Sequence, residues 1–184
     1  MKTHTLEKDW TAHGFRCVVL MNHTTGNRCG YVGIPKGHLL HGVDYSCHSI
    51  KALPFWLRAR RGKIGKRGFI PILCNCSRQS WTEVPTLDVV FDVHGSITYS
   101  GDDRNGYPVN GDGLWWFGYD CGHCDDAPEL NAISSISARG VYERYPRHGI
   151  VRSLEYCVDE CERLAEQLKV LRCFMDLLTG RTIA

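Results

Sequence analysis

LDVVFDVHGSITYS at 87–100 and LWWFGYDCGHCDD at 114–126 are the two stretches that decide the fold. In both, apolar and aromatic residues alternate with other residues, which is typical of β-strands that bury one face. The intervening segment 101–113 is rich in Gly, Asp and Asn and is expected to be a loop. Polar side chains stand at or near the ends of both predicted strands, where proteins often place reactive groups: Asp92, His94, Asp120, His123 and Asp126.

Two further strands and one long helix complete the predicted architecture. The strands are expected at 15–21 and 28–35, and the turn between them favours a hairpin. Residues 151–178 carry an apolar residue every three to four positions, with Ser153 as a candidate N-cap and Gly180 as a candidate C-terminal cap. The predicted fold class is therefore α+β, a mainly antiparallel sheet with a long C-terminal amphipathic helix packed on one face.

Length and composition favour one globular domain spanning 1–184. The chain has 184 residues, of which 43% are hydrophobic and 23% charged. A formal net charge of +2 gives no argument for binding to nucleic acid or to a membrane. No apolar run approaches the roughly 20 residues that span a bilayer, and the N-terminus lacks the apolar core of a secretory signal. We therefore expect a cytoplasmic protein whose ten cysteines are reduced thiols, and a homo-oligomer remains open.

The segment 58–68 is basic and is interrupted by three glycines, which disfavour a stable helix. It holds six Lys or Arg residues and no aromatic residue that would stack on a single-stranded nucleic acid. We interpret it as a solvated insertion loop, with attraction for phosphate as the alternative.

Two histidine–carboxylate pairs are the main candidates for chemistry. Asp92 and His94 are two residues apart and share a face if they lie in a strand, and Asp120 and His123 converge if the chain turns at Gly122. Such a set suits a general base held by an acid, or a divalent metal such as Zn, Mn or Mg. Alternatively, the four groups only tie strand ends together through hydrogen bonds. The catalytic and metal-ligating candidates are thus Asp92, His94, Asp120 and His123.

The predicted pocket lies where the ends of the two central strands meet a loop at 36–45. Strand alternation puts Trp116, Gly118 and Asp120 on one face, where Gly118 leaves room for a ligand cleft. The ligand-binding candidates are Lys36, His38, Tyr45, Thr98, Trp116 and Asp126.

Two weaker patterns give further alternatives. Cys121 and Cys124 form a Cys-x-x-Cys pair that would make a structural zinc site if Cys157 and Cys161 supplied the remaining ligands. The simpler interpretation is that these cysteines are small buried side chains. His94-Gly95-Ser96, paired with His23-Thr24-Thr25, has the form of the His-x-Ser/Thr motifs of some phosphoesterases, although the flanks of His23 favour a turn.

The motifs DVHGSITY at 92–99 and WWFGYDCGH at 115–123 resemble those of a family of small proteins encoded by tailed phages and prophages. CGYVGIPKGH at 29–38 and LEYCVDEC at 154–161 fit the same family, so the resemblance covers most of the chain. Two departures are Ser96, where the family usually has glycine, and the basic run, which the family usually lacks. The resemblance implies a phage accessory protein that counters host defence by acting on a nucleotide signal.

The leading functional hypothesis is a hydrolase that cleaves a phosphoester, with a host nucleotide immune signal as the candidate substrate. His94 would be the general base or a metal ligand, and Asp92 would orient it. Asp120 and His123 would complete the site, and Lys36 or a basic-run arginine would hold phosphate. The alternatives are a non-catalytic protein that sequesters the same nucleotide-like ligand, and a protein–protein inhibitor whose aromatic string or helix stripe is partly exposed.

Overall fold

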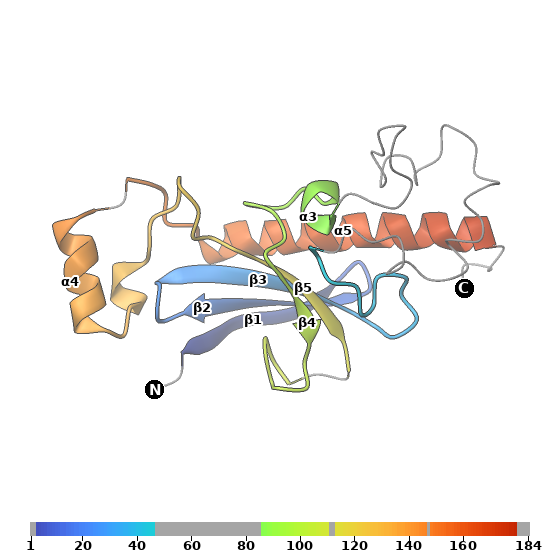
Figure 1. Ribbon diagram of the computed structural model, residues 1–184, viewed down its shortest axis with the longest axis horizontal. Helices are drawn as coiled ribbons and strands as arrows, with labels where there is room; N and C mark the ends of the chain where they lie inside the picture. Colours follow the sequence, from blue (N-terminus) through green and yellow to red (C-terminus); the bar gives the residue numbers. More distant parts are fainter. Residues whose placement is uncertain (1–2, 47–85, 111–112, 147, 180–184) are drawn as a thin grey trace.

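The computed structural model describes residues 3–46, 86–110, 113–146 and 148–179 (Figure 1). Strands of one sheet lie in the order β1-β2-β3-β5-β4, and all neighbours are antiparallel. Helix α5, Leu154–Thr179, lies along one face of this sheet and confirms the α+β prediction. The basic run at 58–68 lies outside the described residues. The strands are β1 His4–Ala12, β2 Phe15–Asn22, β3 Asn27–Ile34, β4 Tyr99–Asp102 and β5 Trp115–Asp120.

The predicted N-terminal hairpin is confirmed as β2 and β3, while β1 is an additional strand that pairs with β2. A tight turn joins β1 to β2, with positive φ at His13 (52°) and Gly14 (85°), as two-residue hairpin turns require. Strand β1 is at the edge of the sheet and its residues are exposed or half-buried, so its sequence carries little hydrophobic alternation.

The predicted strand at 87–100 is wrong in most of its length. Leu87–Val90 form a short helix, α3, and β4 begins only at Tyr99. Between them the chain makes a tight bend, because Gly95 and Ser96 have φ values of 63° and 92° and cannot continue a strand. The apolar residues of this segment are buried against the helix side of the core rather than in a ladder: Leu87, Phe91, Val93 and Ile97.

Helix α5 starts at Leu154, three residues later than predicted, and Ser153 is its cap because its hydroxyl oxygen accepts a hydrogen bond from the Tyr156 amide (3.1 Å). Its apolar stripe packs against β2 and β3 in the larger core. The stripe is fully buried, as expected for a helix whose stability comes from packing on a sheet: Cys157, Cys161, Leu164, Ala165, Leu168 and Leu171.

The predicted alternation in β5 is confirmed. Phe117 and Tyr119 belong to the core beneath α5, whereas Trp116 packs with a smaller cluster on the opposite face. Glycines on that opposite face make room for large rings: a Cβ on Gly118 would lie 2.4 Å from the Tyr31 ring. The smaller cluster contains Val18, Leu20, Cys29, Tyr31 and Trp116, with Tyr99, Tyr107, Val109 and Leu114 packed against it.

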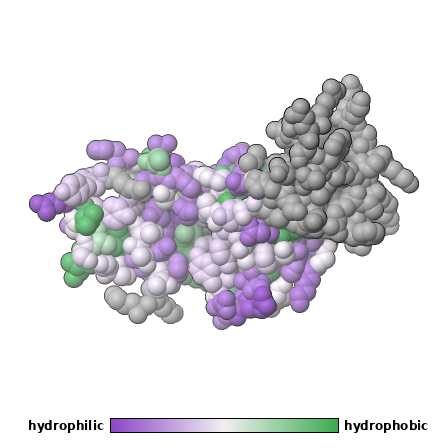
Figure 2. All heavy atoms as spheres, viewed as in Figure 1, coloured by the Kyte–Doolittle hydropathy of each residue, from purple (hydrophilic) through white to green (hydrophobic). Residues whose placement is uncertain are grey.

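A short helix, α4 at Ile136–Arg144, follows the 3-10 turn η2 at Leu130–Ala132 and projects beyond one end of the sheet (Figure 1). It contributes no buried residue, and its Ile136 and Val141 are 88% and 58% exposed. Figure 2 shows exposed apolar residues at the end of the molecule where α4 lies. In the described part of the chain, no helix is long and apolar enough to cross a membrane.

Candidate functional site

The imidazole of His94 is held by hydrogen bonds at both ring nitrogens. Nε2 lies 2.7 Å from Asp126 Oδ2, and Nδ1 lies 2.9 Å from the Tyr156 hydroxyl of α5. The ring is only 10% exposed and meets the Tyr156 ring edge to face. The carboxylate partner of His94 is thus Asp126, which was predicted to bind ligand, and not Asp92.

Asp126 is itself almost completely buried and fully engaged. Its Oδ1 accepts a hydrogen bond from Arg152 Nε (2.7 Å), and its Oδ2 also accepts one from the His123 backbone amide (3.0 Å). Burial disfavours the charged carboxylate, but the hydrogen bonds from Arg152 and His94 outweigh it, so the pKa of Asp126 is lowered. Asp126 therefore stays ionised in a buried ion pair and does not serve as a proton acceptor.

Further contacts fasten the bend before β4 to helix α5. The His94 backbone amide donates to the buried Glu160 carboxylate (2.7 Å), which also pairs with Arg163 at 2.6 Å. The backbone of Asp92 exchanges two hydrogen bonds with the side-chain amide of Gln167, at 2.9 and 2.8 Å. Five residues join this bend and the loop after β5 to the helix. We call them the helix-face network: His94, Asp126, Arg152, Tyr156 and Glu160.

Asp92 and His94 do not share a face as predicted, because this part of the chain is not a strand. The Asp92 carboxylate is exposed and lies 3.6 Å from Arg163. Gly95 and Ser96 follow in left-handed conformations, and a Cβ on Gly95 would lie 1.8 Å from His123 Nε2. The bend thus packs the His123 ring against Gly95. At position 96, a φ of 92° is a backbone conformation that favours glycine.

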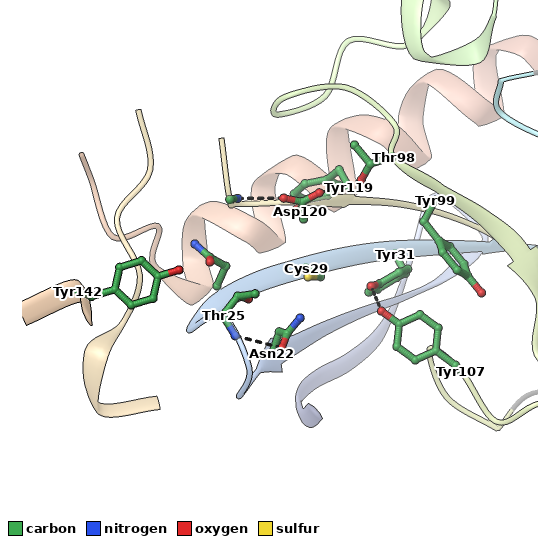
Figure 3. A pocket seen from close by; sticks show the side chains of 12 residues that line it. Asn22, Thr25, Cys29, Tyr31, Thr98, Tyr99, Tyr107, Tyr119, Asp120 and Tyr142 are labelled. Carbon is green, nitrogen blue, oxygen red and sulfur yellow. Dashed lines mark hydrogen bonds between the residues drawn. The ribbon is translucent and has the colours of Figure 1, made fainter. Parts of the chain in front are cut away.

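A cleft of about 470 Å³ opens on the sheet face opposite α5. Figure 3 shows it between the end of the sheet and α4, with the hydroxyl of Tyr142 pointing inward from α4. Its lining combines tyrosines with hydroxyl and amide side chains: Asn22, Thr25, Asn27, Cys29, Tyr31, Thr98, Tyr99, Tyr107, Tyr119, Asp120, Gly122 and Tyr142.

Three tyrosines form one wall of the cleft. The rings of Tyr31, Tyr99 and Tyr107 meet pairwise edge to face, with centroids 5.4–5.6 Å apart. The hydroxyls of Tyr31 and Tyr107 are hydrogen-bonded to each other (Figure 3). Burial raises the pKa of both phenols, so both remain protonated and neutral.

Asp120 connects the cleft to His123. Its carboxylate accepts hydrogen bonds from Thr98 Oγ1 (2.9 Å) and from the Gly122 amide (3.0 Å). Oδ1 also lies 4.0 Å from His123 Nε2, so the predicted turn at Gly122 does bring Asp120 and His123 together. His123 Nε2 makes no hydrogen bond with the described residues.

The loop at 36–45 lies away from these groups, and the prediction that it meets them is wrong. Strands β3 and β5 are antiparallel, so Ile34 pairs with Trp115 while Cys29 pairs with Asp120 at the other end. This register also determines where the remaining ligand-binding candidates lie. Lys36 lies beside Gly113, His38 is buried against Phe15, the Tyr45 amide donates to Ser100 Oγ, and Trp116 is fully buried in the sheet.

The other two patterns also separate in space. Cys124 is exposed, whereas Cys121 is buried with its Sγ 3.6 Å from Cys157 Sγ. His23 Nδ1 bonds the Ala132 carbonyl (2.7 Å), away from His94. Within the described residues, no group of three or more His, Cys, Asp or Glu side chains is arranged to hold a metal ion.

Most of the cleft, including the tyrosine wall, was not predicted from the sequence. Tyr99 and Tyr107 come from the β4–β5 hairpin and Tyr31 from β3, so only the strand register brings them together. The sequence did contain one indication. Gly118 has no side chain, which leaves room for the ring of Tyr31 on the neighbouring strand. Comparison with known proteins adds no family: no family model, curated protein or solved structure matches this chain.

Proposed function

We propose that this protein binds a small organic ligand in the tyrosine-lined cleft and holds it without converting it. The observation that carries the proposal is the cleft itself. Its volume of about 470 Å³ lies within the roughly 300–1,000 Å³ of ligand pockets, and aromatic and hydrogen-bonding groups converge on it.

The state of His94 supports binding over catalysis. A general base needs a nitrogen lone pair within hydrogen-bonding reach of its substrate. Both ring nitrogens of His94 instead contact protein groups, and its partners Asp126 and Tyr156 belong to the helix face rather than to the cleft. These contacts favour an anchoring role for His94.

Hydrolysis of a phosphoester is the second candidate, with His123 in the place first assigned to His94. His123 Nε2 has no hydrogen-bond partner among the described residues and lies 4.0 Å from Asp120, which lines the cleft. In this alternative Asp120 and His123 are the catalytic pair, with Asp120 as the member that reaches the cleft. A nucleotide signal as the ligand stays a prediction, for the hydrolase as for the binding protein.

The protein–protein inhibitor receives no such support. It relied on a partly exposed aromatic string or helix stripe. In the string only Trp115 is half-buried, while Trp116, Phe117 and Tyr119 are buried, and so is the described stripe of α5 from Cys157 to Leu171.

A ligand screen followed by chromatography tests the proposal. Purified protein is heated with nucleosides, nucleotides, cyclic nucleotides and small amines, and each ligand that raises Tm is then recovered. At 100-fold excess over its Kd, a ligand adds about 2.7 kcal/mol of stability, and we expect at least one to do so and to return intact. Recovery of cleaved ligand would establish the hydrolase, and the absence of any stabilising ligand would overturn the binding function.

A further inference from the structure

We infer that the ligand of this cleft carries a protonated amine with N–H donors, and that Asp120 pairs with its positive charge. The inference rests on the proposed binding function and adds the chemical class of the ligand.

The charge of the lining is the first observation. Among the twelve lining residues, Asp120 is the only acidic or basic one, and its side chain is 40% exposed. A phosphate in this cleft would approach a carboxylate with no Lys or Arg in the lining to offset the repulsion, whereas a cation would be attracted to it.

The tyrosines experience the same negative potential. Burial raises the pKa of Tyr107, and nearby Asp120 adds to that rise. Burial also raises the pKa of Tyr99, with further contributions from Asp102 and Asp103. Asp102 is already paired with Arg104 (Nε to Oδ2, 2.6 Å), so Asp120 is the carboxylate whose potential disfavours a phenolate and favours a bound cation.

Hydrogen-bonding capacity is the second requirement that Asp120 meets. A carboxylate offers about four lone-pair sites, and Asp120 uses one for Thr98 and one for Gly122. An ammonium group has three donors, which the free sites of Asp120 and neighbouring hydroxyl oxygens can accept. The Tyr142 hydroxyl points into the cleft from the opposite side (Figure 3).

The packing of the rings explains why N–H donors are favoured over a fully methylated ammonium. A quaternary ammonium is bound through open aromatic faces. Here Tyr31, Tyr99 and Tyr107 pack on one another, and Tyr31 is only 3% exposed. The cleft therefore offers oxygen acceptors more than ring faces.

Isothermal titration with putrescine and spermidine tests the inference, with choline, adenosine and AMP as comparisons. We expect the two polyamines to bind more tightly than all three comparison ligands, and more weakly as salt is raised. Asp120→Asn should weaken polyamine binding at least tenfold. The matched control is Asp125→Asn, an exposed carboxylate in the following loop, which should change it less than twofold.

A second variant guards against misfolding of Asp120→Asn. Tyr142 lies on α4, which buries no residue, so Tyr142→Ala should keep the wild-type Tm and still weaken binding several-fold. Polyamine binding that survives both variants would place the amine outside the cleft and overturn the inference. Tighter binding of choline, adenosine or AMP would overturn the amine class but leave the binding function standing, and failure of every ligand would overturn both.

Discussion

The helix-face network and the cleft are both built from polar side chains at the same end of β5, yet they differ in how completely those side chains are satisfied. In the network, Asp126 is 1% exposed and accepts hydrogen bonds from His94, Arg152 and His123. In the cleft, Asp120 is 40% exposed and keeps unused acceptor sites. The comparison teaches that saturation by protein partners, more than residue type, separates a structural anchor from a candidate ligand site.

The largest expected effect is on the network side. Asp126→Asn removes the charge that Arg152 faces and turns an amide donor toward groups that now donate to the carboxylate. Breaking a buried charge pair from one side costs about 3 kcal/mol, so chemical denaturation should show a loss of that size. Asp125→Asn, the exposed neighbour, should change stability by less than about 0.5 kcal/mol. Equal stability of the two variants would contradict the anchoring role.

Acid should reveal the same contact without a mutation, and with a smaller effect. Because its native pKa is lowered, Asp126 contributes stability that is fully present above its unfolded pKa of about 3.9 and is lost as pH falls through the native value. The wild-type protein should therefore lose more stability than Asp126→Asn between pH 5 and pH 3. Parallel curves of unfolding free energy against pH would show that another group carries the acid sensitivity.

The smallest expected effect is on the cleft side. Tyr107→Phe leaves the buried Tyr31 hydroxyl without its partner, which should cost about 1 kcal/mol. Tyr145→Phe is the matched control, since Tyr145 is 69% exposed and should not change stability. Both are measured by thermal unfolding. A loss from Tyr107→Phe as large as that from Asp126→Asn would erase the distinction between the two regions.

Periodicity predicted the parts of the fold that repeat regularly. The hairpin of β2 and β3, the two faces of β5 and the stripe of α5 are all regular patterns of apolar residues. The segment 87–100 has the same apolar content but is shaped by tertiary contacts, since Glu160 and Gln167 of α5 bind its backbone in place of a neighbouring strand. The sequence of the segment itself does not indicate those partners.

The candidate site was predicted only as far as the chain itself brings residues together. Asp120 and His123 are three residues apart, so a turn was enough to predict their approach. His94 and Asp126 are 32 residues apart, and nearer Asp92 was the natural choice on spacing alone. The cleft likewise depends on strand register, which aligns Tyr31 and Tyr99 with the same residue of β5, Gly118.

Helix α4 gives the cleft a wall of a different kind from the sheet. None of its nine residues is buried, and so short a helix has little stability of its own in water. Local opening of α4 therefore costs far less free energy than unfolding of the sheet, and its amide hydrogens will exchange with solvent long before those of β3 or β5. For the ligand proposed here, fraying of α4 around Tyr142 would therefore set how fast it enters or leaves, while the sheet would hold the other contact groups in place.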